Sequence, residues 1–218
     1  MALDPSHERC QGRSIENRAG SLIENITRTL YVRLETGSGF ARIPAGCCPM
    51  KRRKTIRIGI ITDTHGLFDP AVRRYFKSVD HILHAGDIGN RSVIEQLEQI
   101  APVTAVSGNV DNCEQSSFPS EAVLDIAGHR IAIRHILYEG GKMTKEGRAF
   151  LEREQPDVCI FGHTHQTKTE WFGKTLLFNP GSAGPKRFKF LRGIGLLSLC
   201  GAEVKPRLIS LPDKARHS

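Results

Sequence analysis

The regular alternation of short apolar runs with helical segments after residue 55 constrains the fold more than any other feature. The runs TIRIGIIT, HILHAG, PVTAVSG and DVCIFG are rich in β-branched and apolar residues, which is typical of buried strands. The segments DPAVRRYFKSV, NRSVIEQLEQI and MTKEGRAFLEREQ have helical spacing, and Asp69 with Pro70 fits a helix start. This alternation predicts an α/β fold built in layers.

The other predicted strands follow one another without helices. EAVLDIAGHRIAIRH predicts a hairpin that turns at Gly128, and TKTEWFGKTLLFN predicts one that turns at Gly173. GIGLLSL and EVKPRLISL are late strands. We therefore expect two sheets flanked by helices rather than one doubly wound parallel sheet.

Composition changes near residue 50 and suggests two parts. Residues 1–49 contain scattered glycines and no strong strand, so we interpret them as an N-terminal extension of uncertain order. Residues 50–218 contain every strong strand and form the predicted folded domain.

Charge and cysteine content limit the class of protein. The net charge is +8, and part of it lies in the run KRRKTIR. This run is either a nucleic-acid contact or a solvated segment that precedes the first strand, and we favour the solvated segment. None of the six cysteines forms a C-x-x-C pair, which disfavours a thiolate zinc site. With no export signal and no apolar run of about 18 residues, the sequence indicates a cytoplasmic protein with reduced thiols and no membrane partner.

Polar residues follow five of the predicted strands, at the point where each strand ends. Ligands of layered α/β folds bind beyond the carboxyl ends of strands, so we expect these side chains to converge. Several are next to a glycine, which lets a strand turn sharply in a crowded site. The candidates are Asp63, His65, Asp87, Asn109, His135, His163 and His165.

Each of these signals is weak alone. A lone polar strand end is usually a turn residue that caps its own backbone, and a lone His135 in strand phase is more often a satisfied core histidine. The joint order D-x-H, GD, GN, H and GHxH, with every member at a strand end, favours a metal site.

This order resembles the calcineurin-like metallophosphoesterases, and in particular the small bacterial and archaeal phosphodiesterases of the YfcE type. The resemblance covers about residues 55–210 and rests on DTHG, AGD, SGN, GHTH and NPGS. It implies a four-layer α/β/β/α sandwich of two mixed β-sheets flanked by helices, and makes residues 50–218 a metallophosphoesterase domain.

The resemblance also implies a two-metal site. Asp63, His65, Asp87 and His165 would hold one metal, and Asp87, Asn109, His135 and His163 the other, with Asp87 shared between them. Asp87, Asn109 and His135 would in addition act in catalysis. Arg187 would bind substrate, by analogy with basic residues that follow NPGS in relatives.

The sequence departs from the family pattern at two positions. Val110 stands where many relatives have a histidine that protonates the leaving group, although the YfcE-like branch also lacks it. Ile136 follows His135 where relatives usually have glycine, which makes His135 the least secure ligand.

The ligand chemistry favours transition metals, because the set offers nitrogen and oxygen but no sulfur, and four imidazoles disfavour Mg²⁺ and Ca²⁺. The expected cofactors are two divalent ions, with Mn²⁺ favoured and Ni²⁺, Fe, Co²⁺ or Zn²⁺ as alternatives. The expected activity is hydrolysis of a phosphate ester by in-line attack of a metal-bridging hydroxide, with a phosphodiester as the favoured substrate.

Two other functions stay open. One is a non-catalytic metal-binding scaffold of the same fold. The other is a nuclease. This alternative is based on the basic run KRRKTIR and on GPKRFKF, where basic and aromatic residues alternate. We favour a small phosphodiester as the partner over nucleic acid, and homo-oligomerisation remains open.

Overall fold

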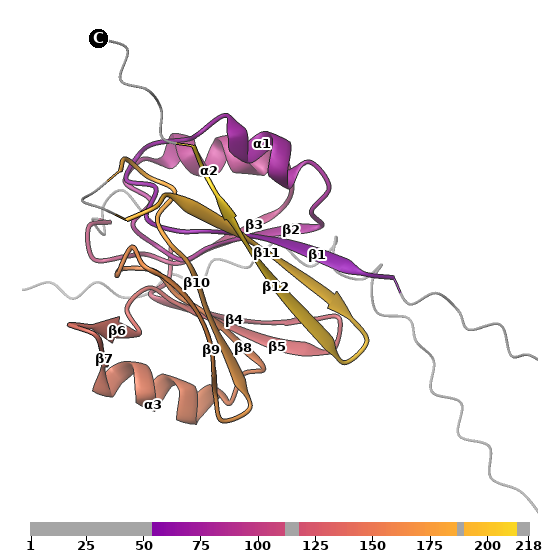
Figure 1. The fold of residues 1–218 in the computed structure, drawn as a ribbon, viewed down its shortest axis with the longest axis vertical. Coiled ribbons are helices and arrows are strands. Elements are labelled where there is room, and N and C mark those ends of the chain that lie inside the picture. Colours follow the sequence, from indigo (N-terminus) through magenta and orange to yellow (C-terminus); the bar gives the residue numbers. More distant parts are fainter. Residues whose placement is uncertain (1–53, 112–117, 187–189, 213–218) are drawn as a thin grey trace, which may run out of the picture. The chain divides into compact units, whose positions relative to one another are not determined.

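The computed structural model describes residues 54–111, 118–186 and 190–212. The extension predicted for residues 1–49 lies outside this range. Within it the chain forms two five-stranded sheets that face each other, with helices on both outer sides (Figure 1). The predicted four-layer α/β/β/α sandwich is confirmed.

The first sheet is built from both ends of the domain. Its order is β12-β11-β1-β2-β3, where β1 pairs in parallel with β2 and antiparallel with β11. The late strands therefore return to the sheet that the first strands begin. The bounds are β1 Ile56–Ile61, β2 His81–His84, β3 Val103–Ala105, β11 Gly193–Cys200 and β12 Glu203–Ser210.

The second sheet has the order β4-β5-β8-β10-β9. Its inner strands β5, β8 and β10 are parallel, and β4 and β9 pair antiparallel at the edges. The two predicted hairpins therefore supply four of its strands. The bounds are β4 Glu121–Ile126, β5 His129–Arg134, β8 Val158–Ile160, β9 Thr167–Phe172 and β10 Thr175–Pro180.

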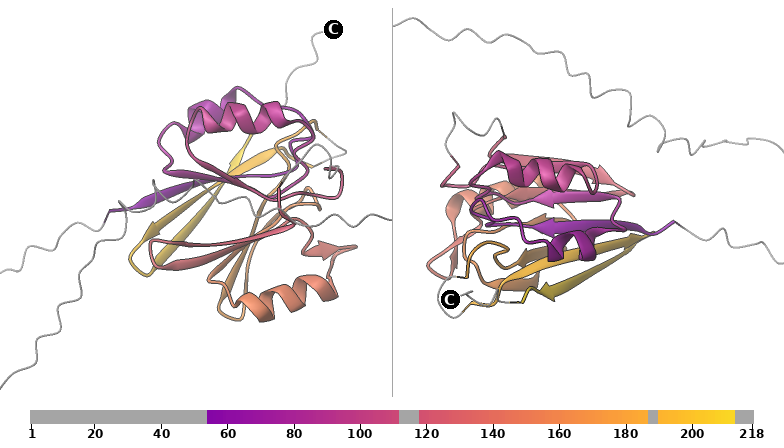
Figure 2. Two further views of the ribbon diagram at one scale, coloured as in Figure 1. Left: turned by 180° about the vertical axis from the view of Figure 1, so that it is seen from behind. Right: turned by 90° about the horizontal axis from the view of Figure 1, so that it is seen from above.

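Three apolar clusters separate the four layers. Helices α1 (Ala71–Phe76) and α2 (Arg91–Glu98) cover the outer face of the first sheet, and α3 (Lys145–Glu154) covers the second (Figures 1 and 2). The central cluster, with Ile60 and Phe178 fully buried, lies between the sheets. Because both faces of each inner strand are covered, those strands read as continuous apolar runs.

The helix boundaries agree with the sequence in part. Asn90 caps α2 by accepting the Ser92 N–H, and Thr144 caps α3 by accepting the Gly147 N–H. At α1 the N-cap position is Pro70 rather than Asp69, the predicted cap. Asp69 accepts the Ala71 N–H, but it is buried and forms an ion pair with Arg192 at 2.8 Å. None of the described helices is long and apolar enough to cross a membrane.

One element was not predicted. Strands β6 (Tyr138–Glu139) and β7 (Lys142–Met143) form a small hairpin around Gly140 and Gly141, which both have positive φ. A Gly-Gly pair between two short segments is a hairpin signal, and two-residue strands are too short to show alternation.

Candidate metal centre

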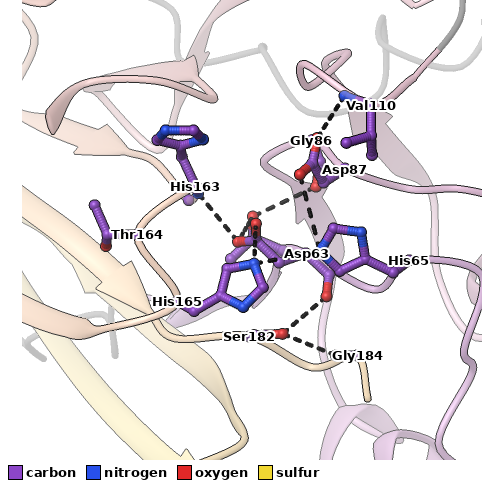
Figure 3. A network of polar contacts seen from close by, with 12 residues as sticks. Asp63, His65, Gly86, Asp87, Val110, His163, Thr164, His165, Ser182 and Gly184 are labelled. Carbon is purple, nitrogen blue, oxygen red and sulfur yellow. Dashed lines mark hydrogen bonds and ion pairs between the residues drawn. The ribbon is translucent and has the colours of Figure 1, made fainter. Parts of the chain in front are cut away.

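The seven predicted residues come together at one edge of the sandwich. Strands β1, β2 and β3 are parallel neighbours in one sheet, and β5 and β8 are parallel neighbours in the other. Their carboxyl ends therefore meet, and Figure 3 shows several of these side chains pointing toward one another from both sheets. Convergence of this kind is what a metal site needs and what isolated turn residues would not give.

A first group gathers around His165. Its Nε2 lies 3.2 Å from Asp63 Oδ1 and 3.2 Å from His65 Nε2. The three ligand atoms lie within 4.8 Å of one another, close enough to share one ion.

A second group consists of Asp63, Asp87 and His135, again with ligand atoms within 4.8 Å. Asp87 faces both groups, because its Oδ1 is 3.3 Å from His135 Nε2 and its Oδ2 is 3.9 Å from His65 Nε2. Asp63 belongs to both clusters as well, so two carboxylates lie between the imidazoles.

Asn109 completes the second group. Its Oδ1 lies 3.2 Å from His135 Nε2 and 3.0 Å from His163 Nδ1. His135 Nδ1 is 2.7 Å from the carbonyl oxygen of Ala85, to which it donates. Nε2 is then the His135 atom that faces the oxygens of Asn109 and Asp87, so it is the atom that would bind a cation placed between them.

The charges at this edge are strongly coupled. Burial by itself would raise the pKa of Asp87, but the hydrogen bond and charge of His135 and the Val110 N–H outweigh burial, and the pKa falls to about 2. Burial would lower the pKa of His135, yet its hydrogen bond to Asp87 and the charge of Asp63 raise it. The arrangement therefore favours an anionic Asp87 with a positive charge close by.

Asp63 gives the clearest sign that a cation fits. The side chain is fully buried; Oδ2 accepts from Thr62 Oγ1 at 2.8 Å and from the His163 N–H at 3.2 Å. Oδ1 is buried and makes no hydrogen bond, and its polar neighbour is His165 Nε2 at 3.2 Å. Because a buried carboxylate oxygen without a hydrogen bond is costly, an ion between Asp63 and His165 would offset a penalty already built into the fold.

The backbone is strained at the same residues. Seven non-glycine residues in the described ranges have a positive φ. Two lie at a hairpin turn and a helix end, and the other five are candidate ligands with φ between 46° and 66°. Strain of this kind persists where the surrounding structure holds it for a function. The five are Asp63, His65, Asp87, His163 and His165.

Two glycines allow the close packing of these loops. A Cβ on Gly162 would lie 2.0 Å from Thr62 Oγ1 and 2.6 Å from Asp63 Oδ2. A Cβ on Gly108 would lie 2.1 Å from Asp87 Oδ1. Any larger residue would displace a carboxylate of the centre.

Residues outside the predicted set hold the loops in place. Asp111 accepts three backbone N–H groups, from Gly108 at 2.8 Å, Gly89 at 2.9 Å and Ile88 at 3.1 Å, and so ties the loops after β2 and β3 together. Asn179, in NPGS, donates to Gly162 O at 2.9 Å. The GNVD spacing was the available signal for Asp111, since Asp and Asn often bond to nearby backbone.

His84 has a supporting position. Thr64 Oγ1 donates to Ile88 O at 3.0 Å, so His84 Nε2 must donate to Thr64 Oγ1 at 3.0 Å, and His84 Nδ1 accepts the Gly86 N–H at 3.2 Å. Burial lowers the pKa of His84 to about 4, consistent with a neutral ring. The side chain therefore joins the loops after β1 and β2 without contacting a candidate ligand directly.

The departures from the family pattern leave the geometry intact. Ile136 does not displace His135, which is buried beside Asn109 and Asp87. Val110 is 47% exposed, and its N–H donates to Asp87 Oδ1 at 3.1 Å. Arg187 lies outside the described residues.

The fold and this centre define a class of metal-dependent phosphoesterases, and sequence comparison agrees. Residues 56–201 match the family model of the calcineurin-like phosphoesterase superfamily domain. The chain belongs to this superfamily.

Individual relatives are consistent with this assignment. A probable metallophosphoesterase of Methanocaldococcus jannaschii is 35% identical over 59% of this chain and 68% of its own length. A phosphodiesterase of the same organism is 26% identical over 69% of this chain and 95% of its own length. Among solved structures, Vacuolar Protein Sorting 29 from Cryptosporidium parvum has the same fold, with a TM-score of 0.63 at 22% identity over 74% of this chain and 94% of that chain.

Proposed function

We propose that this protein is a two-metal phosphodiesterase that hydrolyses a small phosphodiester. The observation that carries the proposal is the convergence of three acidic or amide side chains and four imidazoles at one edge of the sandwich, where Asp63 Oδ1 is buried and makes no hydrogen bond. The relative that is named a phosphodiesterase supports the same substrate class.

In this proposal the residues divide into two ligand sets that share Asp87. Two carboxylates, one amide oxygen and four ring nitrogens make a donor set that suits Mn²⁺ and its neighbours in the first transition row. The first set is Asp63, His65, Asp87 and His165, and the second is Asp87, Asn109, His135 and His163.

When bound, two divalent ions supply Lewis acidity, which lowers the pKa of water and neutralises charge on the phosphoryl oxygens for in-line attack. The protein supplies orientation. Ala85 O fixes the His135 ring through Nδ1, and Thr62 Oγ1 and the His163 N–H fix Asp63. Since these partners are held by the backbone of both sheets, the ligand geometry is organised in advance of binding.

Val110 limits the leaving groups that the proposed enzyme can cleave efficiently. With an aliphatic side chain there, the chain places no proton donor at this point, so esters with acidic leaving groups should react faster than alkyl esters. Positioned proton donation is worth about 100-fold or more, so the difference is measurable.

The first experiment compares bis(p-nitrophenyl) phosphate with p-nitrophenyl phosphate, using metal-stripped protein with Mn²⁺, Ni²⁺, Co²⁺ or Zn²⁺ added back. The proposal expects metal-dependent cleavage of the diester in preference to the monoester, and its loss in Asp87→Ala. A folded protein that binds metal but cleaves neither ester would support a non-catalytic scaffold instead.

A further inference from the structure

A cleft with a volume of about 420 Å³ opens beside the candidate metal centre. Its walls are the β6–β7 hairpin, with Gly140 and Gly141 at the turn, and the loop from His163 to Lys168. His163 and Thr164 line the cleft and belong to the GHTH segment of the centre. A molecule in the cleft would therefore lie next to a phosphate bound at the metal centre.

The cleft has the size of a ligand site. Small-molecule sites commonly have volumes of about 300–1,000 Å³, so this cleft is large enough for an organic group and not only for water. At the Gly140–Gly141 turn a Cβ on either glycine would meet nothing within 4 Å, so the turn leaves open space.

The lining offers several hydrogen-bonding groups. Lys168 Nζ lies 3.1 Å from Glu170 Oε2, so its charge is already balanced. The Tyr138 hydroxyl donates to Glu170 Oε1 at 2.6 Å, and the Tyr138 ring is contacted by Lys168 Nζ at 4.6 Å and by Phe161 at 5.5 Å. The other polar groups of the lining are the carboxylate of Glu139, the hydroxyls of Thr164 and Thr167, the amide of Gln166 and the hairpin backbone. Carboxylate, hydroxyl and amide groups can bind the hydroxyls of an uncharged group, so the lining suits such a group better than an acyl chain.

The metal centre has different surroundings on its other side. Val110 and Thr164 lie on opposite sides of Asp63 in Figure 3, and Val110 is exposed and apolar. A phosphodiester carries two organic groups on one phosphate. One group can lie on the Val110 side while the other lies in the cleft. A monoester has a single organic group and could occupy only one of these two places.

We propose that this cleft binds the ester group that stays on the phosphate, an uncharged hydroxylated group of nucleoside or glycerol size. The inference rests on the proposed phosphodiesterase function. In that hydrolysis water forms a new P–O bond, the P–O bond to the leaving group breaks, the leaving oxygen takes up a proton, and the ester in the cleft remains intact. The cleft therefore selects the substrate without taking part in bond making.

The first test varies only the retained group. p-Nitrophenyl thymidine 5′-phosphate and methyl p-nitrophenyl phosphate have the same leaving group, and we expect kcat/KM to be at least about tenfold higher for the thymidine ester. Gln166→Trp, which fills the cleft, should remove most of this preference. The matched control is Thr169→Trp, an exposed position on β9 that does not line the cleft, and it should keep the preference.

The second test measures binding without turnover. Calorimetric titration of the Mn²⁺-loaded protein compares thymidine 5′-monophosphate, glycerol 3-phosphate and methyl phosphate, which have the same phosphate charge. Tightest binding of the thymidine compound assigns the cleft to nucleosides, and tightest binding of the glycerol compound assigns it to glycerol. Equal affinity for all three overturns the inference.

The two proposals can fail separately. Turnover of both p-nitrophenyl esters at equal rates would support the phosphodiesterase function and contradict the role of the cleft in substrate selection. Preferential binding that Gln166→Trp abolishes, with no turnover of any ester, would support the cleft as a ligand site and contradict the phosphodiesterase function.

Discussion

His65 Nε2 and His165 Nε2 lie 3.2 Å apart, although 100 positions separate the two residues in the chain. One follows β1 in the first sheet, and the other follows β8 in the second. The distance therefore depends on how the two sheets are packed, and it links the stability of the sandwich to the geometry of the candidate metal centre.

Asp63→Asn should separate metal binding from folding. The substitution removes the charge on a buried carboxylate whose Oδ1 makes no hydrogen bond and has His165 Nε2 as its polar neighbour at 3.2 Å, so without metal the free energy of unfolding should change by no more than about 1 kcal/mol. The increase in Tm that Mn²⁺ gives the wild type should disappear. Differential scanning fluorimetry with and without Mn²⁺ measures both.

The control for this experiment is Asp125→Asn, which changes an exposed carboxylate on β4. It should keep the Mn²⁺-dependent rise in Tm. A full Mn²⁺ response in Asp63→Asn would mean that Asp63 is not a ligand.

Val110→His should improve reactions that need leaving-group protonation. The side chain is 47% exposed, so a histidine fits without repacking, and its neighbour Asn109 lies at the centre. We expect kcat/KM for diesters with alkyl leaving groups to rise by about 10-fold to 100-fold, with little change for p-nitrophenyl esters. The measurement is the slope of log kcat/KM against leaving-group pKa.

Val110→Gln is the matched variant, because it adds polarity without a titrating group. An equal gain in both variants, or none in Val110→His, would contradict the hypothesis that the wild type lacks a proton donor at this position.

His84→Gln should change how stability depends on pH. The unfolded imidazole takes up a proton near its ordinary pKa of 6.5, whereas the buried ring resists protonation until about pH 4. The unfolded state then binds more protons in this window, so the wild type loses stability as pH falls from about 6.5 to about 4, by up to about 1.4 kcal/mol per pH unit. The variant lacks this contribution and should show a shallower slope.

Urea denaturation at several pH values, with a chelator present so that metal occupancy does not vary, measures the slope. At neutral pH the variant should be less stable by about 1–3 kcal/mol, because the Gly86 N–H and Thr64 lose their partner. Identical slopes for the two proteins would show that folding does not change the pKa of His84.

Gly162→Ala should destabilise the protein and weaken metal binding together. The added Cβ would meet Thr62 Oγ1 and Asp63 Oδ2 at 2.0 and 2.6 Å, so a carboxylate must move, at a cost of about 1–3 kcal/mol. Gly128→Ala is the comparison: this hairpin glycine has φ +84° and open space, so only the backbone cost of about 1 kcal/mol applies.

Chemical denaturation and Mn²⁺ titration of both variants measure these effects. Only Gly162→Ala should lower Mn²⁺ affinity. Equal Mn²⁺ affinity in both variants would mean that the loop after β8 does not position Asp63.

The sequence by itself was enough to predict the layered α/β fold and to name candidate residues that the structure brings close together. Apolar periodicity identified the long strands and the three helices, because burial of one face or both leaves a local pattern. The strand ends identified the seven candidate residues, because parallel strands in one sheet bring their carboxyl ends to one edge.

Only the tertiary structure decided how these pieces meet. It joined β11 to β1, placed His65 beside His165, buried Asp63 Oδ1 without a hydrogen bond and formed the cleft beside the β6–β7 hairpin. None of these relationships has a local signature, since each depends on the packing of segments far apart in the chain. The sequence determined which chemical groups stand at each strand end, and the packing of two sheets decided which of them face one another.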